Sequence, residues 1–214
     1  MTTLTEVPVD EVFASALRGQ PCLVWDADEC RGLLPVDSWL RDADAFDHEL
    51  LALCHGPTVD IGCGPGRMAH ALARRGRAVL GIDIVPEAVA ISLRRGVSAL
   101  LRDVFGPIPG EGRWETALLA DGNIGIGGDP VALLERTRDL VTRGGRVVVE
   151  VAPPGTGVVT RHISIETEVG RSDVFPWTQV GSDAIGAVAR AAGLRLRSQQ
   201  RFGDRWCAVL DVPR

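Results

Sequence analysis

The stretch that decides the fold runs Val59-Asp60-Ile61-Gly62-Cys63-Gly64-Pro65-Gly66-Arg67. It begins with apolar residues typical of a buried strand, passes through three alternate glycines, and continues as a helical pattern to residue 75. Glycine permits a tight turn and lets a ligand approach the backbone closely. The stretch therefore predicts a strand, a ligand-binding turn and a helix in succession.

Strands and helices continue to alternate after this stretch. Further strands are expected at 78–82, 97–101, 116–120 and 146–151, with helices that open at Pro86 and at Asp129-Pro130. This alternation predicts an α/β fold, with a doubly wound, mostly parallel Rossmann-like sheet between two layers of helices. Two more strands, 194–199 and 206–212, are separated by too few residues for a parallel crossover. We expect a three-layer α/β/α fold whose seven-stranded sheet has an antiparallel last strand.

Two segments do not follow this alternation of strands and helices. Residues 1–55 carry helical patterns and are too short to bury a core alone, so we expect an N-terminal helical cap on a main domain at 56–214. Residues 152–180 form an unusually long strand-to-helix connection. Because an insertion at the carboxyl end of a parallel strand lies beside the usual ligand crevice, we expect it to be a substrate lid.

The glycine-rich stretch, with Asp60 two residues before the first glycine, resembles motif I of the class I S-adenosylmethionine-dependent methyltransferases. In that family the loop holds the methionine part of the cofactor, whose ammonium and sulfonium charges suit an acid such as Asp60. Two later motifs, Gly81-Ile82-Asp83 and Arg102-Asp103-Val104, extend the resemblance, which covers residues 57 to about 151. It implies that Asp83 accepts hydrogen bonds from both ribose hydroxyls, that Asp103 contacts the adenine amino group, and that Val104 packs on the ring.

The cofactor-binding residues that the resemblance implies are Asp60, Gly62, Cys63, Gly64, Gly66, Asp83, Ile84, Asp103, Val104, Asp121 and Gly122. Each acid also has a local explanation: Asp60 as a helix cap, Asp83 as a turn residue, and Asp103 as the first residue of an Asx-turn. We expect Arg67 either to bind the carboxylate of the cofactor or to occupy an exposed position on a helix.

The fourth strand leads into the run Asp121-Gly122-Asn123-Ile124-Gly125-Ile126-Gly127-Gly128-Asp129-Pro130. In the family this position lines the junction of cofactor and methyl acceptor, and here it holds the only asparagine of the chain. A hydroxyl acceptor often needs a general base. The catalytic candidates are His162 in the expected lid, Asn123, and Glu150 at the end of the fifth strand.

The amino-acid composition limits the reactions that the chain can catalyse. All 23 basic residues are arginine, and the chain has no tyrosine. This excludes Schiff-base catalysis and the lysine of a Walker-type nucleotide site. The net charge of −5 disfavours a nucleic-acid partner, and five cysteines without a C-x-x-C pair predict free thiols, a cytoplasmic location and no metal site.

Together these features predict a bacterial enzyme that transfers a methyl group from S-adenosylmethionine to a small molecule by in-line displacement and releases S-adenosylhomocysteine. The alternatives are a methyltransferase acting on RNA or protein, an NAD(P)-dependent oxidoreductase, and a non-catalytic protein that binds the cofactor. We expect no membrane partner, and the sequence leaves open the acceptor, the acceptor atom and the oligomeric state.

Overall fold

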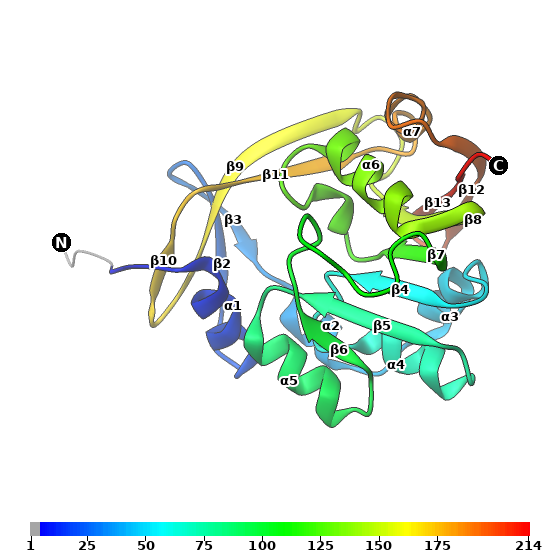
Figure 1. Cartoon of the computed structure of the whole chain (residues 1–214). Helices are drawn as coiled ribbons and strands as arrows, with labels where there is room; N and C mark the ends of the chain where they lie inside the picture. Colours follow the sequence, from blue (N-terminus) through cyan, green and yellow to red (C-terminus); the bar gives the residue numbers. More distant parts are fainter. Residues whose placement is uncertain (1–4) are drawn as a thin grey trace.

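Two sheets organise the chain (Figure 1). The computed structural model describes residues 5–214. The larger sheet has seven strands in the order β12-β13-β8-β7-β4-β5-β6. These are β4 (Thr58–Ile61), β5 (Val79–Asp83), β6 (Ala99–Leu101), β7 (Trp114–Leu119), β8 (Val141–Val151), β12 (Arg195–Phe202) and β13 (Arg205–Asp211). Strands β4 to β8 pair in parallel, whereas β13 pairs antiparallel with both β8 and β12. The expected sheet, with its antiparallel last strand, is confirmed.

Helices cover both faces of this sheet because its central strands are apolar on both sides. In β8, Val149 packs in one core with Leu133, whereas Val148 faces the other way and packs with Leu51 and Leu72. The helices around this sheet are α3 (Ala45–Ala52), α4 (Arg67–Arg74), α5 (Pro86–Arg94), α6 (Pro130–Leu140) and α7 (Ile185–Ala191). Figure 1 shows α4 and α5 on the opposite side of the sheet from α6, so the three-layer arrangement is also confirmed.

The second sheet joins the N-terminal segment to the insertion at 152–180, the two segments that depart from the strand–helix alternation. Its strands are β1 (Glu6–Val7), β2 (Leu23–Asp26), β3 (Glu29–Leu33), β9 (Val158–Thr167), β10 (Gly170–Ser172) and β11 (Phe175–Val180). They run in the order β1-β10-β9-β2-β3, with β11 also paired to β9. Helix α1 (Val9–Leu17) packs on this sheet, where Ile165 contacts the cluster that contains Val12.

The N-terminal segment therefore differs from the expected helical cap. It contains α1, α2 (Val36–Leu40) and α3, but also three strands. Strands β1 and β2 find their partners in the insertion at 152–180, more than a hundred residues later in the chain. The segment and the insertion form one unit beside the carboxyl ends of the parallel strands.

In the part of the chain that the structure describes, no helix is both long and apolar enough to cross a membrane.

Candidate active site

The glycine-rich stretch forms a tight turn between β4 and α4. Gly62, Gly64 and Gly66 all have positive φ angles, of 67°, 55° and 84°, which other residues rarely adopt. Space is also restricted, because a Cβ atom at Gly62 would lie 2.7 Å from Nδ2 of Asn123. Cys63 is buried beneath the turn, with Sγ 3.6 Å from the carbonyl oxygen of Gly64. Burial raises the pKa of this thiol, so Cys63 fills space below the loop.

Asp60 lies under the glycine turn and is 2% exposed. Its Oδ2 atom has no hydrogen-bond partner among the described residues. Burial, reinforced by the nearby charge of Asp121, raises the pKa of Asp60 to about 7. A buried carboxylate with a free oxygen is suited to a cationic group at the loop.

Asp83 ends β5, and its carboxylate is held in a fixed orientation. Its Oδ2 accepts a hydrogen bond from the backbone N–H of Gly64 at 2.8 Å, and Oδ1 accepts one from Val85 at 2.9 Å. Burial raises the pKa of this carboxyl group. A carboxylate offers about four lone-pair positions, so both oxygens can still accept from a ligand's hydroxyl groups.

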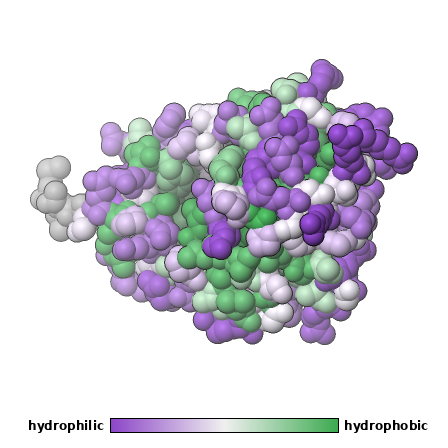
Figure 2. Space-filling view, viewed as in Figure 1, coloured by the Kyte–Doolittle hydropathy of each residue, from purple (hydrophilic) through white to green (hydrophobic). Residues whose placement is uncertain are grey.

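Apolar side chains are exposed next to Asp83. They are Ile84, Leu101 and Phe105, at 52%, 47% and 46% exposure. Figure 2 shows hydrophobic surface over the β5–β6 side of the molecule. Val104, which was expected to pack on a ring, is instead buried in the core, so Phe105 is the apolar side chain that this loop exposes. Asp103 is exposed, and its Oδ1 accepts a hydrogen bond from the N–H of Phe105 at 3.0 Å, as in an Asx-turn.

Asn123 ties the loop after β7 to the glycine turn. It begins the short 3₁₀ helix η1 (Asn123–Gly125), and its Nδ2 donates to the carbonyl oxygens of Ile61 and Gly62, at 2.9 Å each. Because both amide hydrogens are used on backbone carbonyls, only the amide oxygen remains to accept a hydrogen bond from a ligand.

A group of six charged side chains lies beside this loop, which we call the ion-pair cluster. Its members are Arg41, Asp47, Arg67, Asp121, Glu150 and Arg205. Arg67, the first residue of α4, pairs with Asp47 and places Nη2 2.5 Å from both carboxylate oxygens of Asp121. Arg67 was considered for the carboxylate of the cofactor, but these contacts use it within the chain. Sequence patterns do not identify Asp47 or Arg205 as site residues, because the two are 158 residues apart and meet only in the folded chain.

Asp121 and Glu150 are linked through this cluster. Asp121 has a φ of 51°, and its backbone N–H donates to Oε2 of Glu150 at 2.8 Å. Burial raises the pKa of Asp121, although Arg67 opposes the shift. Arg205 donates Nε to one oxygen of Glu150 at 2.7 Å and Nη2 to the other at 2.6 Å. Through these contacts Glu150 holds the backbone of Asp121 and the side chain of Arg205 in place, whereas its use as a base stays a prediction.

His162 lies on β9 in the second sheet and is exposed. It lines a concavity of about 910 Å³ together with Asp26, Arg161 and Arg171. The cluster residues are absent from that lining. Its role as a base also stays a prediction.

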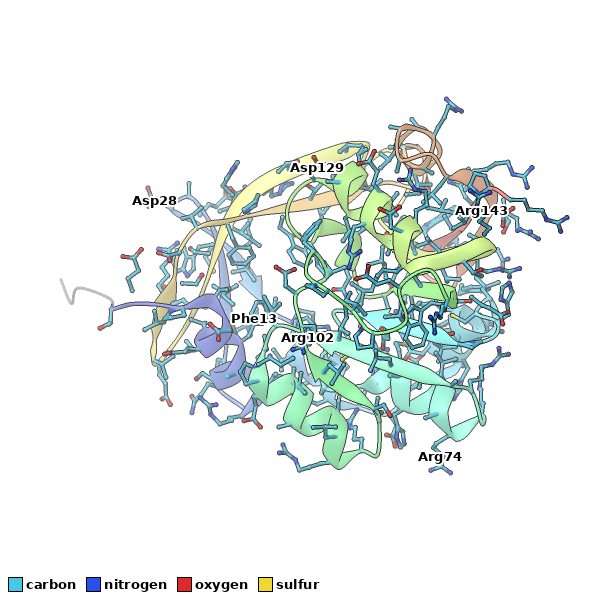
Figure 3. The ribbon with its side chains drawn as sticks, in the orientation of Figure 1. Phe13, Asp28, Arg74, Arg102, Asp129 and Arg143 are labelled. Carbon is cyan, nitrogen blue, oxygen red and sulfur yellow. The ribbon has the colours of Figure 1, made fainter. Side chains whose placement is uncertain are left out.

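The insertion contacts the loop after β7 directly. The hydroxyl of Thr178 donates to the carbonyl oxygen of Gly128 at 2.5 Å. A Cβ atom at Gly125 would lie 2.6 Å from the carbonyl oxygen of Thr178, and one at Gly128 would collide with Pro176. Figure 3 shows the neighbouring Asp129 beside the β9–β11 hairpin, and Asp28 at the far end of the second sheet. Gly125 and Gly128 thus allow β11 to pack on the loop, a function that the sequence did not distinguish from ligand approach.

Comparisons with known proteins agree with this geometry. Residues 58–145 match a family model described as a methyltransferase domain. An uncharacterized protein of Mycobacterium tuberculosis is 34% identical over 156 residues, which is 72% of this chain and 51% of that protein. The chain spans about half or less of the length of the curated relatives it matches.

Solved structures share this fold over most or all of the chain. A SAM-dependent methyltransferase from Bacteroides fragilis, in complex with S-adenosylhomocysteine, superposes with a TM-score of 0.80 at 20% identity and covers 100% of both chains. The 1,6-didemethyltoxoflavin-N1-methyltransferase of Burkholderia thailandensis gives a TM-score of 0.60 at 20% identity and covers 83% of this chain and 82% of its own.

Proposed function

We propose that this chain transfers the methyl group of S-adenosylmethionine to a small molecule, because residues 58–145 match a methyltransferase domain and the chain has the fold of S-adenosylmethionine-dependent methyltransferases. One observation carries the proposal. The carboxyl ends of β4, β5 and β7 place Asp60, Asp83 and Asp121 around the glycine turn, where Asp83 accepts a hydrogen bond from Gly64 and Asp60 keeps a buried oxygen without a partner among the described residues. Three carboxylates around a glycine turn fit a ligand with a positively charged end and a ribose.

The described residues fit this cofactor in their chemistry. The unpartnered Oδ2 of Asp60 is suited to the cationic methionine end. The fixed carboxylate of Asp83 would hold the ribose hydroxyls, and Asp103 with the exposed side chains of Ile84 and Phe105 would take the adenine. Gly64 and Gly122 have open space where a side chain would stand, so a ligand can approach the backbone there, whereas Asn123 and Ser92 fill that space at Gly62 and Gly66.

The mechanism requires little covalent chemistry from the protein. S-adenosylmethionine, when bound, supplies a methyl group already activated by its positively charged sulfur. The chain's residues then need to align the acceptor and exclude water. The amide nitrogen of Asn123 is used on backbone carbonyls, so its amide oxygen would be the atom that accepts a hydrogen bond from an acceptor's N–H or O–H group. The β9–β11 hairpin, packed on Gly125 and Gly128, would cover the acceptor from above, with His162 as the candidate base for a hydroxyl acceptor.

A small-molecule acceptor is supported by the structural neighbours, among which are a 1,6-didemethyltoxoflavin-N1-methyltransferase and a sugar N-methyltransferase. The acidic composition favours this class over RNA. We also propose a cytoplasmic location, which the five free cysteines support.

Calorimetric titration tests the proposed cofactor. We expect S-adenosylmethionine and S-adenosylhomocysteine to bind and NAD not to bind. Asp83→Asn should weaken binding by about tenfold or more, because the amide cannot accept at both positions. Asp129→Asn is the matched control, since Asp129 caps α6 and asparagine caps equally well. Binding of NAD alone would support the oxidoreductase alternative, and binding without turnover on any small-molecule acceptor would support the non-catalytic one.

A further inference from the structure

Asp47 lies outside residues 58–145, on the N-terminal helix α3, yet it is the most buried acid of the ion-pair cluster. Its side chain is 0% exposed. It accepts hydrogen bonds from Arg205 Nη1 at 2.5 Å, Arg41 Nη1 at 2.9 Å and the backbone N–H of Asp44 at 3.0 Å, and it pairs with Arg67. Burial acts to raise the pKa of Asp47, but the hydrogen bonds from Arg67 and Arg205 hold it well below its usual range.

Two of these arginines reach past Asp47 to the candidate active site. Arg67 holds Asp47 with Nη1 and Asp121 with Nη2. Arg205 holds Asp47 with Nη1, while its Nη2 lies 2.6 Å from Glu150 and 3.3 Å from Asp121. A guanidinium is a rigid planar fork, so fixing one edge fixes the direction of the other.

Asp121 is the residue that this arrangement orients. Its positive φ is unfavourable for a residue other than glycine and persists only where the surroundings enforce it. Glu150 holds its backbone N–H, and Arg67 holds both of its carboxylate oxygens. Of the cluster's acids, Asp121 is the most exposed, at 29% of its side chain, and so the one available to a ligand.

We propose that Asp47 is a positioning residue of the cofactor site, which holds Arg67 and Arg205 from behind so that they fix Asp121 at the cationic end of the cofactor. The inference rests on the proposed function. It makes the N-terminal segment part of the cofactor site as well as a cover for the acceptor. Without the charge of Asp47, the buried guanidinium of Arg67 keeps Asp121 as its only carboxylate partner and is free to turn.

The test measures the affinity for S-adenosylhomocysteine by calorimetry and the Tm of each variant. Asp47→Asn should lower the Tm and also raise the Kd by about tenfold or more. Leu51→Ala, which opens a cavity on the same helix, should lower the Tm and leave the Kd unchanged. Asp211→Asn, which weakens ion pairs with Arg195 and Arg197 outside the cluster, should likewise leave the Kd unchanged.

Arg205→Gln supplies an independent measurement if Asp47→Asn does not fold. It removes the second route from Asp47 to Asp121 and should also raise the Kd. A wild-type Kd in both Asp47→Asn and Arg205→Gln, or in Arg205→Gln where it alone folds, would show that the cluster only stabilises the fold and would overturn the inference. Failure of the wild-type chain to bind S-adenosylhomocysteine is a different result, which would overturn the proposed function itself.

Discussion

Asn123 provides the sharpest test of how the site is held together. Its amide nitrogen donates two hydrogen bonds of 2.9 Å to the carbonyl oxygens of Ile61 and Gly62. Each such bond contributes about 1 kcal/mol, so Asn123→Ala should lower the free energy of unfolding by about 2 kcal/mol. For a chain of this length that loss corresponds to a fall in Tm of about 4–8 °C.

Asn123→Asp separates hydrogen bonding from simple loss of volume. The carboxylate has nearly the same shape as the amide but cannot donate, and it would face two carbonyl oxygens. We therefore expect the aspartate variant to be less stable than the alanine variant, with both binding S-adenosylhomocysteine more weakly than the wild-type chain. Gln179→Ala, which removes an exposed amide on β11, should change neither quantity.

Thermal unfolding followed by circular dichroism, together with calorimetry, provides the readout. An aspartate variant as stable as the wild-type chain would mean that the Asn123 amide does not bridge the two loops. The amide oxygen would then not be held in place for a ligand either.

Three further outcomes are expected. Burial raises the pKa of Asp60 to about 7, so the folded state favours the protonated form and the stability that this group supplies falls as pH rises from about 4 to 7. In denaturant unfolding, Asp60→Asn should remove that fall, which amounts to at most about 4 kcal/mol. Parallel pH profiles of the variant and the wild-type chain would contradict this expectation. Gly128→Ala should loosen the hairpin and speed proteolysis within 152–180, whereas Gly155→Ala, at a similar φ with open space around it, should not; equal cleavage rates would disprove the packing role. Cys30 is the exposed cysteine, so mass spectrometry of the folded chain after brief iodoacetamide treatment should find one modified thiol, and modification of the four buried cysteines at a similar rate would contradict the fold.

Local patterns were sufficient to predict the main sheet. The apolar run at Val59, the glycines after it and the short link between β12 and β13 each determine structure within a few residues. Such features depend on periodicity and turn chemistry, which can be seen in a single sequence.

The second sheet could not be predicted in the same way. Every residue of β3 is exposed, so the strand buries no apolar face, and β2 pairs with β9, far along the chain. Pairing of this kind depends on which surfaces meet after folding.

The ion-pair cluster was missed for a related reason. Asp47 and Arg205 are 158 residues apart, and charged residues are usually exposed. Gly125 and Gly128 leave room for close approach, but whether a ligand or a strand approaches is decided by the fold.

A crystal structure of the chain with S-adenosylhomocysteine bound would show whether the three carboxylates around the glycine turn hold the cofactor. We expect the ribose hydroxyls on Asp83, the adenine beside Asp103 and Phe105, and the amino-acid end between Asp60 and Asp121. Density for the ligand in the concavity of the second sheet, or none at a saturating concentration, would contradict it.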